Sequence, residues 1–127
     1  MRPGELYRVD IVKAVRSIAA FLEGAEETRW LSDEQLQSAV QWKLMNIGEA
    51  ASGISEATRT RRPDVPWKRI HGFRNVLAHA YFSVGLDAVW TTCNTSIPAL
   101  EKDVLDLLWL MDPDRARRFG SPHGDLG

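Results

Sequence analysis

Apolar residues recur at helical spacing along most of this chain, and no segment alternates strictly between apolar and polar residues. The first such stretch spans about residues 7–23 and ends before Gly24, a residue suited to close a helix. Its apolar residues fall three or four positions apart, at Ile11, Val15, Ile18 and Leu22. That spacing gives a helix one apolar stripe, which must be buried against another helix. The pattern therefore predicts an all-α fold.

A second helix is expected to begin at residues 32–35, where Ser, Asp, Glu and Gln form a capping-box pattern with acidic residues in the first turn. Its apolar face comprises Leu36, Val40, Leu44 and Ile47. The helix is expected to continue past Gly48 to about Ala57. Gly48 and Gly53 each cost a helix about 1 kcal/mol relative to alanine. We therefore expect another helix to pack closely at these glycines.

A polar connection at residues 59–65 separates this helix from a third one at about 67–79. Pro66 suits the first position of the third helix, because its missing N–H needs no partner there. A fourth helix is expected at about 86–111, with a kink caused by Pro98. Together these stretches predict an up-and-down bundle of four to five helices with short connections.

The composition changes after residue 111, where Pro, Gly and Arg dominate and apolar residues nearly vanish. This change predicts a helical domain at residues 1–111 and a flexible C-terminal tail at residues 112–127, disordered unless a partner orders it. The chain has 127 residues, of which 44% are hydrophobic, so a single packed domain is the simplest organisation.

Charge and cysteine content limit the classes of function. The formal net charge is -1, so no global basic field indicates nucleic-acid binding, and any such site must be local. The single Cys93 excludes an internal disulfide and is typical of a reducing compartment; a buried small hydrophobe is its simplest role, and a nucleophile the alternative. The chain lacks an apolar run of about 18 residues, and its N-terminus lacks the apolar core of a signal peptide. We expect a soluble, cytoplasmic protein with no membrane association.

The segment at residues 74–81, Arg-Asn-Val-Leu-Ala-His-Ala-Tyr, concentrates more chemistry than any other part of the chain. The guanidinium of Arg74 is permanently charged and binds phosphate in a fork. The imidazole of His79 can transfer protons near neutral pH. Asn75 can hydrogen-bond a phosphate or fix His79. The simpler alternative is an Arg and a His that only solvate a helix face or stabilise its C-terminal end.

The order Arg, polar residue, three further residues, His, any residue, Tyr resembles the signature of the HEPN superfamily of ribonucleases. The chain looks most like the HepT-like toxins of bacterial and archaeal toxin–antitoxin pairs. Flanking segments are similar too, and they extend the resemblance to about residues 7–111: Ile47–Ala51, Pro66–Ile70, and Tyr81–Phe82 followed by Leu86–Trp90. The resemblance implies a HEPN-type bundle and a metal-independent endoribonuclease without a cofactor. Its catalytic residues would be Arg74 and His79, supported by Asn75.

Cleavage of RNA needs a base for the 2′-hydroxyl, an acid for the 5′-oxygen and positive charge beside the phosphorane. Positions 74 and 79 lie about 140° apart on a continuous α-helix, so they do not share one face. The resemblance implies a homodimer whose signature helices line a shared cleft, where a two-fold axis would supply two Arg and two His. His71 is a competing base, although an exposed or interface histidine is its simpler role. No His, Cys or carboxylate cluster has metal-ligand spacing.

A basic run precedes the signature, with six cations between positions 59 and 74 and a single acid at Asp64: Arg59, Arg61, Arg62, Lys68, Arg69 and Arg74. This run could attract an RNA backbone, and we single out Arg61, Arg62, Lys68 and Arg69 as candidate RNA contacts. A solvated helix end is the equally weighted alternative, and Glu49 and Glu56 can neutralise part of the run. Trp67 could stack a base, but a core anchor is its simpler role.

Tyr81 follows the predicted helix and is expected to be accessible. In HepT-like families the Tyr at this place is modified by the antitoxin, a minimal nucleotidyltransferase that transfers AMP to the phenol. The resemblance therefore implies AMPylation of Tyr81, which would place a bulky anion beside the RNA site. A packed ring with a hydrogen-bonded hydroxyl is the alternative.

Two other functions are compatible with the sequence. One is a noncatalytic HEPN-type module that binds nucleotide or RNA, or that serves as a scaffold for a nucleotidyltransferase. The other is a dimeric helical interaction domain, which the five Trp residues permit. The intact Arg74, Asn75 and His79 favour the ribonuclease.

Overall fold

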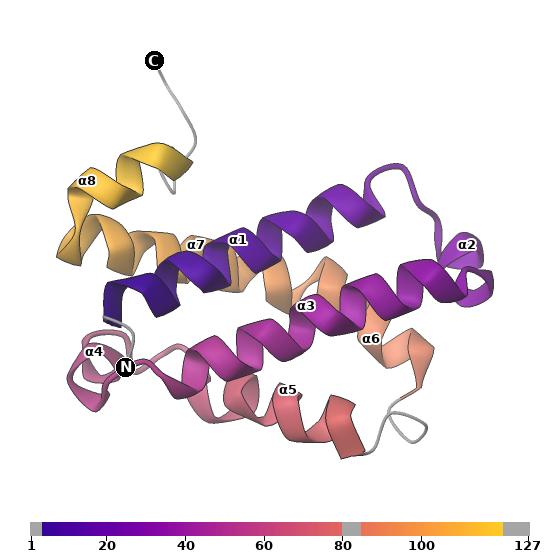
Figure 1. Ribbon diagram of the computed structural model, residues 1–127, viewed down its shortest axis with the longest axis horizontal. Coiled ribbons are helices and arrows are strands. Elements are labelled where there is room, and N and C mark those ends of the chain that lie inside the picture. The colour runs from indigo at the N-terminus through magenta and orange to yellow at the C-terminus, as the bar shows by residue number, and fades with distance from the viewer. Residues whose placement is uncertain (1–3, 80–84, 121–127) are drawn as a thin grey trace.

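The computed structural model describes the backbone of residues 4–79 and 85–120 and the side chains of residues 6–74 and 85–120. Most of these residues lie in helices, and there is no β-strand among them. Three long helices form the centre: α1 (Gly4–Leu22), α3 (Glu34–Ser52) and α7 (Ser96–Met111). The helices α1, α3 and α5 (Trp67–His79) lie side by side, and α7 runs behind α1 (Figure 1). The expected all-α bundle is confirmed.

The core lies where the apolar stripes of the long helices meet. The buried stripe residues are Ile11, Val15 and Ile18 on α1, Leu36, Val40, Leu44 and Ile47 on α3, and Ile97, Leu100, Val104, Leu107 and Leu108 on α7. The predicted faces of α1 and α3 are therefore confirmed, with Leu22 at the end of α1 only half-buried. Burial of one such side chain stabilises a fold by about 1.5–3 kcal/mol. No helix within the described residues combines the length and the apolar composition needed to cross a membrane.

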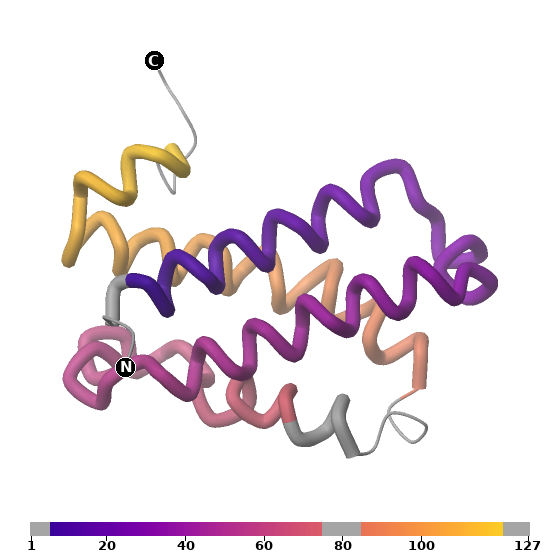
Figure 2. The backbone as a smooth tube through the Cα atoms, in the orientation of Figure 1, coloured from indigo at the N-terminus to yellow at the C-terminus, as the bar shows by residue number. Residues whose placement is uncertain are grey.

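Helix α2 (Glu27–Ser32), which the sequence pattern does not predict, closes one end of the bundle (Figure 2). It is held by Trp30, whose side chain is fully buried. The indole N–H donates to the carbonyl of Leu86 at 2.7 Å, and the ring stacks on Trp90 with centroids 6.2 Å apart. One large anchor thus fixes a helix too short to show an apolar period.

Helix α3 begins and ends at different residues than the capping-box pattern predicts. Asp33 is the N-cap, and its carboxylate accepts from the backbone N–H of Leu36 at 3.0 Å. Ser32 instead ends α2, where its hydroxyl donates to the carbonyl of Thr28 at 3.0 Å. At the other end α3 stops at Ser52 rather than about residue 57, because Gly53, a weak helix former, becomes the C-cap.

Helix α4 (Glu56–Arg61) occupies part of the segment expected to be a polar connection. Ser55 is its N-cap, and the hydroxyl accepts from the N–H of Thr58 at 3.2 Å. Thr58 is buried, and the guanidinium of Arg8, also buried, donates to its hydroxyl at 3.5 Å. The helix is anchored through polar groups, so it has no apolar stripe by which the sequence could predict it.

The helix expected at residues 86–111 is broken rather than kinked. It consists of α6 (Leu86–Asn94) and α7, separated by Thr95. A proline ring clashes with the carbonyl four residues earlier, which here belongs to Asn94, the last residue of α6. Pro98 itself lies in the first turn of α7, where backbone N–H groups need no helical partner.

The C-terminal segment is ordered further than the composition predicts. Residues 113–116 form α8 (Pro113–Ala116) and residues 117–119 form the 3-10 helix η2 (Arg117–Phe119). Ala116 is fully buried, and the guanidinium of Arg16 lies 5.2 Å from the centroid of the Phe119 ring. The Trp109 indole donates to the carbonyl of Gly120 at 2.8 Å. The helical domain therefore continues past residue 111, and residues 121–127 of the expected tail lie outside the described part.

Candidate functional site

Helix α5 carries the Arg–His segment and is anchored at its start. Trp67 is buried, as its core role predicts, and its indole N–H donates to the carbonyl of Arg62 at 3.0 Å. Ile70 is buried one turn later, and its carbonyl oxygen lies close to Gly48 of α3. The helix is continuous from Trp67 to His79, as predicted. The buried Trp67 and Ile70 anchor the first two turns and fix where the following residues lie.

The backbones of α3 and α5 approach each other at Gly48. A Cβ atom on this residue would lie 2.8 Å from the backbone nitrogen of Arg74 and 3.3 Å from the carbonyl oxygen of Ile70. Any side chain at this position would push the helices apart. The expectation that another helix packs closely at Gly48 is therefore confirmed, and this contact sets the place of Arg74.

Arg74 forms an ion pair with Glu49 across the α3–α5 contact. The Nη1 and Oε2 atoms are 3.2 Å apart, and the side chains are 49% and 66% exposed. Ion pairs this exposed typically stabilise a protein by less than about 1 kcal/mol. A phosphodiester offers the guanidinium the same charge and a similar geometry. Arg74 can therefore exchange Glu49 for a phosphate at little cost, and the expectation that Glu49 faces the basic run is confirmed.

The other predicted site residues belong to the same helix or follow it. Asn75 is within α5 and His79 is its last residue, but the side chains of residues 75–79 lie outside the described part. Tyr81 also lies outside it. Because α5 is continuous, positions 74 and 79 are about 140° apart around its axis. A single α5 therefore does not present both positions on one face.

The structure divides the basic run. Arg61, Lys68 and Arg69 are exposed, near the start of α5. Arg59 is half-buried and donates from Nη2 to the carbonyl of Ala51 at 3.4 Å. The exposed members remain open to a phosphate backbone.

Arg62 is bound by the protein itself. Its Nη2 atom lies 2.6 Å from a carboxylate oxygen of Asp103 and 2.8 Å from one of Asp64, and its Nη1 atom lies 3.4 Å from one of Asp106. The bonds to Asp64 and Asp103 raise the pKa of this guanidinium further above its usual range. We assign Arg62 to joining the α4–α5 connection to α7, in place of the expected RNA contact.

The two other candidates for acid–base or nucleophilic chemistry are partly or fully buried. His71 is half-buried, and its Nδ1 atom is buried without a hydrogen-bond partner among the described residues. Cys93 is buried, and burial raises the pKa of its thiol to about 12. A nucleophilic thiolate is disfavoured there, which agrees with the expected role as a small hydrophobe.

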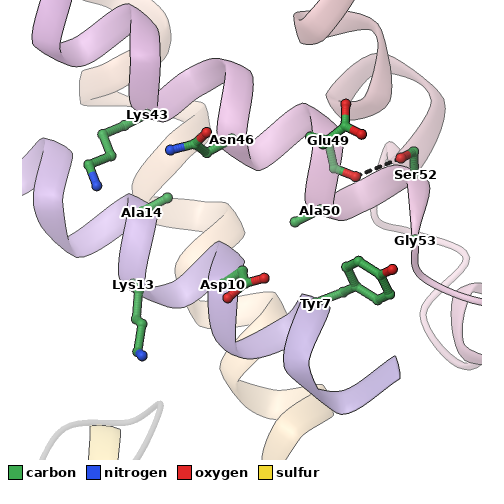
Figure 3. A pocket seen from close by; sticks show the side chains of 10 residues that line it. All are labelled: Tyr7, Asp10, Lys13, Ala14, Lys43, Asn46, Glu49, Ala50, Ser52 and Gly53. Carbon is green, nitrogen blue, oxygen red and sulfur yellow. Dashed lines mark hydrogen bonds between the residues drawn. The ribbon is translucent and has the colours of Figure 1, made fainter. Parts of the chain in front are cut away.

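A polar groove between α1 and α3 lies beside this site and was not predicted (Figure 3). Glu49, the partner of Arg74, is one of its lining residues. The lysines Lys13 and Lys43 line it from the two helices. In the sequence they are isolated cations thirty positions apart, so no local pattern marks them as neighbours.

Comparison with known proteins gives concordant matches. Residues 11–107 match the family model described as Ribonuclease HepT-like. A Thermococcus cleftensis protein named "Probable ribonuclease HepT" is 34% identical over 95 residues, which cover 75% of this chain and 86% of that protein. A "Putative RNase" of Caldanaerobacter subterraneus is 32% identical over 108 residues, covering 85% and 96%. A "Putative RNase" of Methanocaldococcus jannaschii is 28% identical over 103 residues, covering 81% and 94%. No solved structure matches the chain.

Proposed function

The chain belongs to the HepT-like ribonuclease family, and from that premise we propose that it is a metal-independent endoribonuclease toxin of a toxin–antitoxin pair. One observation carries this proposal. The Arg and His of the signature are both present, and Arg74 lies exposed on a rigidly anchored helix, where the exposed Glu49 is its ion-pair partner among the described residues. A guanidinium in that setting is suited to bind a phosphate.

The proposed reaction uses the nucleophile that RNA carries. The 2′-oxygen attacks the adjacent phosphorus while a base removes its proton, and the bond from phosphorus to the 5′-oxygen breaks as an acid protonates that oxygen. The products are a 2′,3′-cyclic phosphate and a 5′-hydroxyl. His79 transfers protons, which typically accelerates such steps by about 10²–10⁴-fold. Arg74 stabilises the charge that develops on the phosphorane, and Asn75 orients the phosphate or His79.

A homodimer would supply the second proton-transfer group. Because positions 74 and 79 do not share a face of α5, one chain does not complete the scheme. Two α5 helices related by a two-fold axis would bring two Arg and two His to one phosphate path. One His79 would then act as the base and the other as the acid.

The first test is cleavage of a mixed RNA pool in EDTA by the wild type and by His79→Ala, each purified without a partner. We expect the wild type to produce 2′,3′-cyclic phosphate ends and the variant to be inactive. If unmodified wild type, verified by intact mass, leaves the RNA uncut, the noncatalytic binding or scaffold function replaces the ribonuclease.

The dimer is tested with a heterodimer of one wild-type chain and one His79→Ala chain, purified through two different tags. If both histidines act on one phosphate, this heterodimer retains almost no activity. If each chain has a complete site of its own, it retains about half. Recovery of half the activity would therefore contradict the shared site.

We also propose that the antitoxin partner is a minimal nucleotidyltransferase that modifies Tyr81. The Tyr81 oxygen would attack the α-phosphorus of ATP and lose its proton, forming a phosphodiester with AMP and releasing pyrophosphate. The added anion would compete with RNA for Arg74. Co-expression with the enzyme should add one adenylate to the wild type and none to Tyr81→Phe, as measured by intact mass. An adenylate on the Phe variant would exclude Tyr81 as the target.

The exposed members of the basic run, Arg61, Lys68 and Arg69, are the proposed contacts for the RNA backbone outside the cleavage site. For single-stranded RNA, each lost phosphate contact should reduce the slope of log affinity against log salt by about 0.7. Arg62 is left out because three carboxylates of the protein already surround its guanidinium.

A further inference from the structure

The groove between α1 and α3 has the size and lining of a small-ligand site. Its volume is about 560 Å³, within the range of roughly 300–1,000 Å³ that is usual for ligand pockets. The lining residues are Tyr7, Asp10, Lys13 and Ala14 of α1, Lys43, Asn46, Glu49, Ala50 and Ser52 of α3, and Gly53. Its floor includes small side chains, which is why the surface is hollowed here (Figure 3).

The two ends of the groove differ in chemistry. Lys13, Lys43 and Asn46 lie toward one end, and Tyr7 and Glu49 lie toward the other (Figure 3). Within the described part of the chain, neither Lys13 nor Lys43 forms an ion pair with a carboxylate. In Figure 3 the Lys13 side chain runs away from α3, so the two mobile ammonium groups would meet on one phosphate only after the Lys13 side chain turns toward the groove.

The opposite end is suited to a nucleobase. The Tyr7 side chain is half-buried and seated over Gly53, where a Cβ atom would lie 2.5 Å from its ring. An aromatic ring at the edge of a hollow can stack a base. The groove is therefore matched to one nucleotide, which carries its phosphate at one end and its base at the other.

Glu49 links the groove to the proposed cleavage site. Glu49 lines it and at the same time pairs with Arg74 on α5 at 3.2 Å. An RNA strand with one phosphate at Arg74 would displace the Glu49 carboxylate and would have to cross α3 at Glu49 to reach the groove.

We propose that the α1–α3 groove binds one nucleotide of single-stranded RNA next to the scissile phosphate. Lys13 and Lys43 hold the phosphate of that nucleotide together, and its base lies at the Tyr7 end. This assignment rests on the proposed ribonuclease function and names the part of the substrate that the helices α1 and α3 would recognise.

The test is RNA binding by the full chain carrying His79→Ala, so that the probe is not cut. The probe is a short, fluorescein-labelled single-stranded RNA, titrated at several salt concentrations. We compare Lys13→Gln, Lys43→Gln and the double variant with Lys102→Gln, an exposed lysine of α7 that serves as the matched control.

Each groove variant should weaken binding about 3–10-fold, and the double variant should lower the salt slope by about 0.7, as expected when one phosphate contact is lost. The double variant should lose less than the product of the two single losses, because both lysines serve one phosphate. Lys102→Gln should stay within about twofold of the parent, because it adds no phosphate contact. Groove variants that bind no worse than Lys102→Gln, or single losses that multiply, would overturn the assignment.

Two further measurements separate the possible failures. Cleavage by the wild type in EDTA, together with unaffected groove variants, would remove the groove assignment alone. Groove-dependent RNA binding by a wild type that does not cleave would remove the proposed ribonuclease and retain the groove. Titration with ATP distinguishes the ligand source, because groove-dependent binding of ATP without any groove effect on RNA would assign the site to a free nucleotide instead.

Discussion

Two arginines of the same basic run have opposite surroundings. Arg62 is 23% exposed and has three carboxylates around it, contributed by its own connection and by α7. Arg74 is 49% exposed and pairs, among the described residues, with one carboxylate that is itself 66% exposed. A cation that several groups fix from different elements stabilises the fold, whereas one held by a single solvated partner can change partners. The difference identifies Arg74 as the member of this pair suited to bind substrate.

The largest expected effect is the loss of RNA cleavage when Arg74 is replaced. Arg74→Ala should reduce RNA cleavage by about 10²-fold or more, because a fixed cation beside the developing charge is lost. The melting temperature should hardly change, since the pair with Glu49 is exposed. Arg29→Ala is the matched control, because it also removes an exposed ion pair, with Asp33. A variant that cleaves normally would exclude Arg74 from the chemistry.

Gly48→Ala probes the helix contact that positions Arg74. A methyl group 2.8 Å from the Arg74 backbone nitrogen forces α3 and α5 apart, and such overpacking typically costs about 1–3 kcal/mol. Urea denaturation should show that loss, and cleavage should fall as well because Arg74 moves. Gly72→Ala on α5 is the control, since nothing lies within 4 Å of its added methyl group. Equal stability of the two variants would contradict the close approach.

Arg62→Ala tests the structural side of the comparison. Its removal leaves three carboxylates without their shared cation, and we expect a loss of about 1–3 kcal/mol of folding free energy in urea denaturation. The turnover of folded protein should stay near that of the wild type. The exposed neighbour, Arg61→Ala, should change stability by less than about 0.5 kcal/mol. A variant of Arg62 as stable as that of Arg61 would show that the network contributes nothing.

Glu49→Gln should strengthen RNA binding at Arg74. With its carboxylate gone, Arg74 has no anionic competitor on α3, so short single-stranded RNA should bind about 2–5-fold more tightly, in line with the modest strength of exposed pairs. Fluorescence titration on the His79→Ala background measures this change. Glu56→Gln, an exposed acid on α4, is the control. Weaker binding by Glu49→Gln would mean that Glu49 assists the substrate.

The smallest effect concerns acid stability at the Arg62 network. The hydrogen bond from Arg62 lowers the pKa of the Asp64 carboxyl. A carboxyl with a lowered folded-state pKa contributes stability above its unfolded value, and that contribution is lost as the pH falls through the folded-state value. Asp64→Asn should therefore be slightly less stable than the wild type near pH 7, with the gap closing below about pH 4. A gap that widens in acid would contradict this sign.

The sequence predicts the helix faces well because burial of a continuous stripe is a local pattern. All the stripe residues of α3 from Leu36 to Ile47 are buried as expected, and Gly48 lies where another helix approaches. The short helices α2 and α4 show no such stripe, because Trp30 and Thr58 anchor them through single contacts with distant residues. The segment at 113–120 is not predicted for the same reason. It contains few apolar residues, and Ala116 and Phe119 order it by packing on α1 and α7.

The candidate site, like the fold, follows from the sequence only in part. The Arg–His segment and its placement on one helix follow from the sequence, but the different uses of Arg62 and Arg74 do not. Both arginines stand in the same polar run, and only the fold places Asp103 and Asp106 around one and Glu49 beside the other. The lysines of the α1–α3 groove are neighbours for the same reason.

By itself the sequence determined the helical class, the buried faces and the presence of the HepT-like Arg–His signature, because each depends on spacing within a single segment. The tertiary structure alone decided which charges are bound by the protein and which are open to a ligand. Electrostatic partners are set by distance in space, and the pairs that matter here join residues far apart in the chain. Gly48 connects the two levels, since the absence of one side chain lets α5 lie where Arg74 meets Glu49.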